Sequence, residues 1–418
     1  MGTFFRSRWV DVPAAVTELA GAVLPAGFRA AGVAAGIKES GAPDLALIVS
    51  DRPTASAARF SRTGAPSAPV LLTRRRTELG EIRAVVVNSG NANAATGNRG
   101  LEDAAKMQGG AAIVCGVSER HVAVASTGVI GVPLPMNRVM SGLAAAGRGL
   151  SPDGGGAFAE AIRTTDAHPK QISLQVALSG GTVTLAVQAK GAGMISPRFA
   201  TLLVFIQTDA ELDADEADLL LSVCTKRSFD RISVDGQLST SDTIILQANG
   251  ASGVRVEPES GDERIFGEAL DAVLRQIALA VIADGEGARR VGRVVVRGGD
   301  DEAVTRVAHA VADSPLVKTA LYGGDPNWGR IIQAVGAALA APAGAAAAPL
   351  AVDIAIEGVT VCAGGSFVVH DAAALAAAVQ RSEVEYEITL GGAEAAETER
   401  YFSDLGHEYV TINADYTT

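Results

Sequence analysis

Short runs of β-branched and aliphatic residues recur along the chain, each bounded by Gly, Asn, Ser or Pro, and stretches with helical spacing lie between them. Such runs are typical of strands, whereas apolar residues that repeat every three or four positions indicate helices. The strand-like runs include "DLALIVS", "RAVVVNSG", "HVAVASTGVIG", "LQVALSGGTVTLAVQ" and "LLVFIQTDA". The helix-like stretches include "LEDAAKMQGGAAIVCG", "PMNRVMSGLAAAGRGL" and "DADEADLLLSVCTKRSF". The alternation predicts a mixed α/β fold.

A second pattern begins near residue 291 with the strand-like run "VGRVVVRGG". One helical stretch follows through "DEAVTRVAHAVADSPLVKTAL", and further strands are expected around "LAVDIAIEG" and "VEYEITLGG". A chain of 418 residues is long enough for two or three separate cores. We therefore expect a larger α/β domain over residues 1–290 and a smaller α/β domain over residues 291–418.

The charge balance excludes several kinds of partner. Asp and Glu number 47 against 35 Lys and Arg, a formal charge of −12, so we expect no nucleic-acid partner and no basic membrane face. We expect no secretory signal, because Pro13, Glu18 and Pro25 interrupt the apolar residues of the N-terminal region. The longest apolar tract, residues 337–352, is alanine broken by two prolines and not a membrane span. We expect a cytoplasmic protein.

The cysteines and histidines lack the spacings of disulfide frameworks and metal sites. The three cysteines are far apart, odd in number and without a CxxC pair, and the five histidines show no HExxH pattern. We therefore expect no disulfide, no metal and a reducing compartment.

Many Gly-, Asn- and Ser-rich loops follow the expected strands, and loops of this kind bring backbone N–H groups and small polar side chains to a site. Together they are typical of an active site assembled from the whole chain. These loops are "NSGNANAATG" (88–97), "STGVIG" (126–131), "TTD" (164–166), "KGAGM" (190–194), "VDGQLSTSDT" (234–243), "DGEG" (284–287), "GGDPNWGR" (323–330) and "INADYTT" (412–418).

A threonine is the candidate nucleophile that remains after the usual motifs are tested. The sequence has no GxSxG elbow, no SxxK motif, no cysteine near a candidate histidine and glycine turn, and no phosphate-binding glycine loop. Thr201 opens the apolar run after "KGAGMISPRFA", where a β-branched residue is also an ordinary start of a strand. An N-terminal threonine carries its own base, an α-amino group with a pKa of about 7.7–8.0. This chemistry requires cleavage between Ala200 and Thr201.

The motifs then show a family resemblance. From "GFRAAGVAAGIKESGAPDLALI" to the last residue, the chain resembles the glutamate N-acetyltransferases, also called ornithine acetyltransferases, of the cyclic arginine pathway. The matching pieces, in the same order, are "NSGNANA", "STGVIG", "KGAGMISP" followed by "ATLL", "DGEGA", "PLVKTALYGGDPNWGRI" and "EYVTINADYTT".

The resemblance implies a fold and a reaction. The larger domain is expected to be a layered α/β/β/α sandwich, and the C-terminal tail of the smaller α/β domain is expected to return to the active site. Self-cleavage would give an α chain of residues 1–200 and a β chain of residues 201–418. Thr201 would then transfer acetyl from N-acetylornithine to glutamate in a ping-pong reaction.

The resemblance also implies roles for individual residues. Thr127 and Gly128, in a sharp "STG" turn, match the family's oxyanion pair. Lys190 matches the lysine that binds the substrate α-carboxylate, and Glu286 matches the acid that meets the side-chain ammonium of ornithine. Further substrate-binding positions are Thr164 or Thr165, Asn413 and Thr418.

Some positions depart from the family pattern, and they leave the substrate and the cleavage rate open. The change at Gln237 removes a negative charge, and Arg198 adds a positive one beside the scissile bond. The departures are Ala95, Arg198, Phe199, Gln237, Leu238, Ser241, Arg289 and Arg290.

Two alternatives remain at this point. The first is an acyltransferase or amide hydrolase with the same N-terminal threonine chemistry and another substrate. The second is a non-catalytic relative that serves as a binding protein. No cofactor is expected, and the resemblance leaves open whether acetyl-CoA also donates acetyl. The resemblance further implies a dimer of αβ units.

Overall fold

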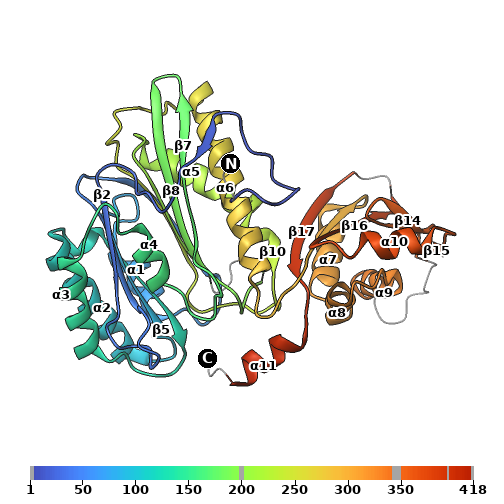
Figure 1. Ribbon diagram of the computed structural model, residues 1–418, viewed down its shortest axis with the longest axis horizontal. Helices are drawn as coiled ribbons and strands as arrows, with labels where there is room; N and C mark the ends of the chain where they lie inside the picture. The colour runs from blue at the N-terminus through green and yellow to red at the C-terminus, as the bar shows by residue number, and fades with distance from the viewer. Residues whose placement is uncertain (1–3, 197–201, 341–349, 393–394, 416–418) are drawn as a thin grey trace. The chain divides into compact units, whose positions relative to one another are not determined.

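The computed structural model describes residues 4–196, 202–340, 350–392 and 395–415. Contacts within the chain divide it into two units (Figure 1). Within the described residues, the first unit holds 4–196, 202–230 and 237–281, and the second unit holds the rest. The second unit thus starts before residue 291 and also includes the short segment 231–236. The expected assignment of domains at residue 290 stays a prediction.

Two sheets form the centre of the first unit. The four-stranded sheet has the order β2-β3-β5-β6, in which only β5 and β6 are parallel. The six-stranded sheet has the order β1-β7-β8-β9-β11-β4, in which only β9 and β11 are parallel. The strands of the first sheet are β2 (Phe28–Val33), β3 (Leu45–Ser50), β5 (Ala84–Asn91) and β6 (Val122–Val129). Those of the second are β1 (Val16–Glu18), β4 (Ala55–Phe60), β7 (Lys170–Leu178), β8 (Gly181–Lys190), β9 (Leu203–Thr208) and β11 (Thr243–Ala248).

Alternation along the strands of the four-stranded sheet produces two cores. Successive side chains of a strand point to opposite faces. In β5, Ala84 and Val86 join the core on one face, and Val85 and Val87 join the core on the other. The second of these cores also includes Phe205 of β9, so the two sheets pack face to face.

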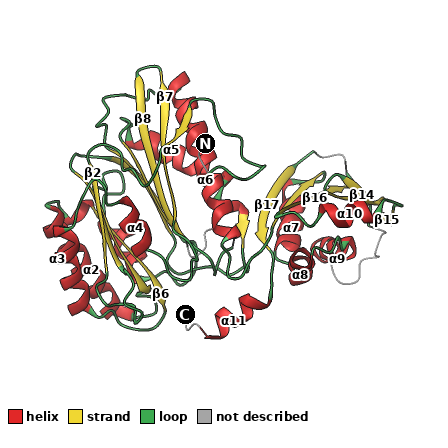
Figure 2. Ribbon diagram, viewed as in Figure 1, coloured by secondary structure: helices red, strands yellow, loops and turns green. Residues whose placement is uncertain are grey.

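Helices cover the outer faces of both sheets (Figure 2). Helices α1, α2 and α3 pack on the four-stranded sheet, and α5 packs on β4 and β11 of the six-stranded sheet. Helix α4 contacts strands of both sheets. The first unit is therefore the expected α/β/β/α sandwich, and the prediction of a mixed α/β fold is confirmed. Its helices are α1 (Ala68–Arg76), α2 (Gly97–Cys115), α3 (Met136–Arg148), α4 (Gly155–Ala161), α5 (Ala214–Arg227) and most of α6 (Gly261–Ala283), which ends in the second unit. Short 3₁₀ helices lie at Glu119–His121 and Phe229–Arg231, of which Arg231 belongs to the second unit.

The second unit has its own sheet and core. Its seven strands have the order β10-β17-β12-β16-β13-β14-β15, and α7, α9 and α10 contribute to the same core as the sheet. The strands are β10 (Ile232–Ser233), β12 (Val291–Arg297), β13 (Val352–Ile356), β14 (Val359–Ala363), β15 (Ser366–Phe367), β16 (Glu383–Leu390) and β17 (Glu397–Ser403). The helices are α7 (Asp301–Ala312), α8 (Pro315–Gly323), α9 (Trp328–Ala338), α10 (Ala372–Ala378) and α11 (His407–Asp415).

The expected single helical stretch after β12 is wrong, because α7 ends at Ala312 and α8 begins at Pro315. Ser314 caps α8, and its hydroxyl accepts the N–H of Val317. Proline at the first helical position fits this new start, since its missing N–H would have no partner there. Among the described residues, no helix is both long and apolar enough to cross a membrane. The three cysteines are free.

Candidate active site

Thr127 and Gly128 lie at the end of β6, so the expected sharp turn is wrong. The parallel ladder between β5 and β6 becomes irregular at Gly90 and Asn91, beside Gly128. Gly128 has a φ of +131°, and a Cβ there would lie 2.3 Å from the carbonyl carbon of Gly90. Only glycine fits this place, where the backbone of β6 meets the irregular end of β5.

Lys190 meets Thr127 inside the first unit. It is the last residue of β8, its side chain is 2% exposed, and its Nζ donates to Thr127 Oγ1 at 3.4 Å. Since Thr127 Oγ1 accepts this bond, its hydroxyl hydrogen stays available to donate elsewhere. The structure therefore brings the expected carboxylate-binding lysine to the expected oxyanion donor.

Thr164 and Thr165 follow α4 in a half-buried segment. The backbone N–H of Thr164 donates to Asp166 Oδ2 at 3.1 Å, and the same carboxylate lies 4.0 Å from Lys190 Nζ. Thr164 thus joins the group of Thr127 and Lys190 through Asp166. No described contact links the side chain of Thr165 to this group.

Sequence reasoning assigned no role to Asp166 or to Lys170, which forms an ion pair of 2.7 Å with it. Burial alone would raise the pKa of the Asp166 carboxyl, but the ammonium groups of Lys190 and Lys170 lower it well below its usual range. The sequence signal was the "TTD" segment with a lysine four residues later. Such a pair is usually exposed, so only the fold reveals its burial.

The proposed nucleophile Thr201, with Ala200, lies outside the described residues. Both backbone polar groups of its neighbour Leu202 are hydrogen-bonded. The N–H of Leu202 donates to Asp242 Oδ1 at 3.0 Å, and its carbonyl accepts the N–H of Thr243 at 3.0 Å. Asp242 is fully buried, and burial raises its pKa well above the usual range. Asp242 is a third residue to which sequence reasoning assigned no role.

Glu286 and Asn413 meet inside the second unit. Asn413 is exposed on α11, and its Nδ2 donates to Glu286 Oε2 at 2.5 Å. Glu286 itself is half-buried. The remaining predicted tail residue, Thr418, lies outside the described residues.

Close packing holds α11 against the loop that carries Glu286. Gly287 has a φ of +74°, and a Cβ there would lie 2.2 Å from Glu408 Cβ at the start of α11. Tyr409 Oη also donates to Asp235 Oδ2 at 3.3 Å. These contacts fix the helix that presents Asn413.

Two departures from the family pattern, Arg289 and Arg290, have clear contacts in the second unit. The Arg289 guanidinium lies over the Tyr322 ring at 4.7 Å. Arg290 Nη1 donates to the Tyr322 carbonyl at 2.5 Å. The backbone N–H groups of both arginines donate to the Asp404 carboxylate at 3.0–3.2 Å. Both residues therefore stabilise the segment after the glycine loop.

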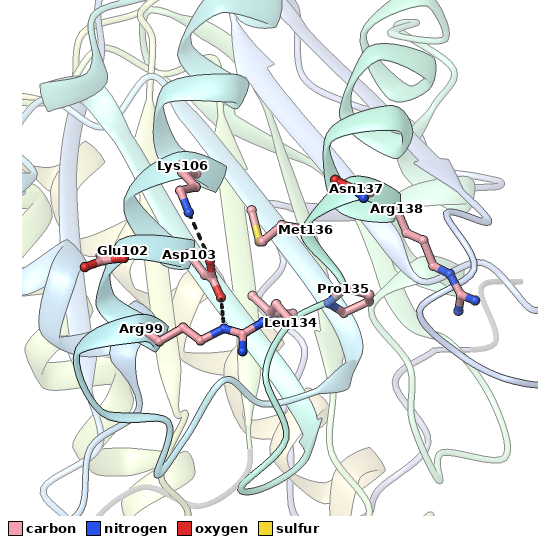
Figure 3. A pocket seen from close by; sticks show the side chains of 9 residues that line it. All are labelled: Arg99, Glu102, Asp103, Lys106, Leu134, Pro135, Met136, Asn137 and Arg138. Atoms are coloured by element: carbon pink, nitrogen blue, oxygen red, sulfur yellow. Dashed lines mark hydrogen bonds and ion pairs between the residues drawn. The ribbon is translucent and has the colours of Figure 1, made fainter.

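A pocket of about 600 Å³ lies between α2 and the start of α3 and contains none of the predicted site residues (Figure 3). Asp103 of α2 lies between Arg99 and Lys106, with nitrogen–oxygen distances of 3.8 and 3.5 Å. These cations offset its buried charge, so the pocket gives no indication of a second reactive site.

Among the described residues, Glu78, Glu81 and His121 form a group whose potential ligand atoms lie within 4.8 Å of one another. His121 Nε2 lies 3.0 Å from a Glu78 oxygen and 3.3 Å from a Glu81 oxygen, and Arg120 pairs with Glu78 as well. Ordinary ion pairs and hydrogen bonds account for this half-exposed group. The absence of a metal stays a prediction.

Comparisons with known proteins extend over both units. The ArgJ family profile matches residues 29–418. The arginine biosynthesis bifunctional protein ArgJ of Symbiobacterium thermophilum is 45% identical, over 95% of this chain and 98% of its own. That of Geobacter sulfurreducens is 44% identical, over 94% of this chain and 99% of its own. A crystal structure of ornithine acetyltransferase complexed with ornithine from Mycobacterium tuberculosis is 41% identical, covers 44% of this chain and 98% of that chain, and gives a TM-score of 0.41.

Proposed function

The chain belongs to the ArgJ family, and from this premise we propose that it moves the acetyl group of N2-acetyl-L-ornithine to L-glutamate. The observation that carries the proposal is the extent of the match, since a relative named for arginine biosynthesis is 45% identical over 95% of the chain. The group of Thr127, Gly128 and Lys190 supports this proposal, because it offers an oxyanion donor and a carboxylate partner side by side.

The first proposed step is self-cleavage. The Thr201 hydroxyl attacks the carbonyl carbon of Ala200, its proton passes to the Thr201 nitrogen, and the peptide C–N bond breaks as an ester forms and the α-amino group is freed. Water then hydrolyses the ester, which leaves a carboxylate on Ala200 and restores the Thr201 hydroxyl. The products are the α chain and the β chain, and the new amine supplies the base that a threonine nucleophile needs.

Acetyl transfer follows in two halves. The Thr201 hydroxyl attacks the acetyl carbonyl of N-acetylornithine while its α-amine takes the hydroxyl proton. The oxyanion of the tetrahedral intermediate is stabilised by Thr127 and Gly128, and ornithine leaves after its nitrogen takes a proton. The amine of glutamate then attacks the acetyl-Thr201 ester, which releases N-acetylglutamate and the free enzyme.

The two charged residues, Lys190 and Glu286, have roles set by their charge. Lys190 pairs with the α-carboxylate that both substrates carry, and Glu286, held by Asn413, pairs with the side-chain ammonium of ornithine. Thr164 or Thr165, together with Thr418, contributes further contacts to substrate. We also propose that the enzyme needs no cofactor, forms a dimer of αβ units and is cytoplasmic.

Intact-mass spectrometry of the wild type and of Thr201→Ala, with and without N-acetylornithine, tests the function. The wild type is expected to give two fragments split at Ala200–Thr201 and an acetyl adduct on the fragment that begins at Thr201. Thr201→Ala is expected to stay a single chain of 42.5 kDa without adduct. A wild type that remains one chain under all conditions would overturn the proposal. Release of acetate in place of N-acetylglutamate would indicate a hydrolase.

A further inference from the structure

One buried carboxylate, Asp166, lies between two buried lysines. Lys170 Nζ is 2.7 Å from Asp166 Oδ1, and Lys190 Nζ is 4.0 Å from Asp166 Oδ2. The side chain of Asp166 is 0% exposed, that of Lys170 is 4% exposed and that of Lys190 is 2% exposed. Two ammonium groups and one carboxylate give this cluster a formal charge of +1, and a buried positive charge favours an anion beside it.

Asp166 also joins two segments of backbone. Its Oδ1 accepts the N–H of Gly191 at 2.7 Å, directly after Lys190, and its Oδ2 accepts the N–H of Thr164 at 3.1 Å. The Asp166 carbonyl accepts Arg163 Nη2 at 2.8 Å. The carboxylate therefore fixes the end of β8, from which the Lys190 side chain extends, relative to the segment after α4.

The distances divide the work between the two lysines. Lys170 makes the short ion pair with Asp166, while Lys190 is held at a longer distance and also reaches Thr127 Oγ1 at 3.4 Å. Removing one member of a buried charge cluster leaves the others uncompensated, so its effects spread to the neighbours.

We propose that Asp166 is a positioning residue for Lys190, and that Lys170 balances its charge so that Lys190 can pair with a substrate α-carboxylate. The inference rests on the proposed function, because the carboxylate belongs to N-acetylornithine and glutamate. Asp166 acts through Lys190 and through the Gly191 backbone, without contacting substrate.

A double-mutant cycle tests this role. The kinetic constants of Asp166→Asn, Lys190→Met and the double variant are measured on protein that has already been cleaved. Asp166→Asn alone is expected to raise the KM for both substrates about tenfold, with a smaller change in kcat. In the Lys190→Met background the same change is expected to alter KM less than about twofold, because residues that act as a unit are not additive.

The matched control is Asp209→Asn. Asp209 is another buried carboxylate of the first unit that accepts backbone N–H groups, from Ala26 at 3.3 Å and Thr184 at 2.7 Å. The Asp209→Asn variant should leave the KM values for both substrates unchanged, even where it lowers stability. If Asp166→Asn is not recovered as folded, cleaved protein, Lys170→Gln takes its place in the cycle.

Additive KM effects of Asp166→Asn, or of its substitute Lys170→Gln, and Lys190→Met would overturn the inference and leave the proposed function standing. Failure of the wild type to form the acetyl adduct would instead overturn the proposed function, before any variant is compared. The two failures are thus distinguished by separate measurements.

Discussion

The Asp242 carboxyl accepts the backbone N–H of Leu202 at 3.0 Å and so anchors the residue directly after the proposed nucleophile. The Leu202 carbonyl is bound in turn by Thr243, the first residue of β11. The chain from Leu202 onward is therefore fixed to the six-stranded sheet.

Replacing Asp242 by Ala should slow precursor cleavage about tenfold, since loss of a buried hydrogen bond costs about 1–3 kcal/mol. Asp242→Asn should cleave within about threefold of the wild type, because burial raises the pKa of Asp242 and a neutral amide also accepts the Leu202 N–H. Gel time courses of freshly expressed precursor would measure both rates. Cleavage of Asp242→Ala at the wild-type rate, or of Asp242→Asn as slowly as Asp242→Ala, would contradict this account.

Glu286→Gln should raise the KM for N-acetylornithine about ten- to a hundredfold, since a hydrogen bond to a charged group is worth about 1.5–3 kcal/mol. The half-reaction with glutamate should change much less, because glutamate has no side-chain ammonium. Separate assays of acetyl-enzyme formation and of acetyl transfer would compare the two substrates. The exposed Glu302 of α7 supplies a control. An equal rise in the KM for N-acetylornithine in Glu302→Gln would argue against a specific role for Glu286.

Much of the fold could be predicted from residue patterns, because the strands of both units are short β-branched runs with clear boundaries. The break between α7 and α8 was missed, although Ser314 and Pro315 carry a local start signal. Asp166 and Asp242 were missed for a different reason. Their roles depend on burial and on which strands pair, such as the register of Leu203 with Thr243, and neither is encoded in local spacing.

Gly287→Ala should displace α11, because the added Cβ would lie 2.2 Å from Glu408 Cβ and the φ of +74° disfavours any L side chain. We expect a rise in the KM for N-acetylornithine close to that of Glu286→Gln, since Asn413 would lose its contact with Glu286. Gly336→Ala in α9 is the matched control, as a Cβ there meets nothing within 4 Å. Unchanged kinetics in Gly287→Ala would show that the position of α11 does not control substrate binding.

Lys318 of α8 makes the stability of the second unit change with pH in the alkaline range. It is 2% exposed, its Nζ donates to the Ser403 carbonyl at 2.9 Å, and burial lowers its pKa from 10.5 to about 8. Between these two values the unfolded chain binds more protons than the folded one, so the free energy of unfolding should rise with pH. Below pH 8 the full cost of burying the charge is present, and it should be relieved by about 3 kcal/mol as the pH reaches 10.5.

The comparison with Lys318→Met isolates this contribution, because groups that titrate in both proteins cancel in the difference. Both proteins carry Thr201→Ala, which keeps the chain intact, and Trp9→Phe, which leaves Trp328 in the second unit as the only tryptophan. Denaturant unfolding is followed by Trp328 fluorescence from pH 7.5 to 10.5. The free energy of unfolding of the protein with Lys318 should rise relative to that of Lys318→Met as the pH rises. A difference that stays constant over this range would mean that Lys318 keeps an ordinary pKa in the folded protein.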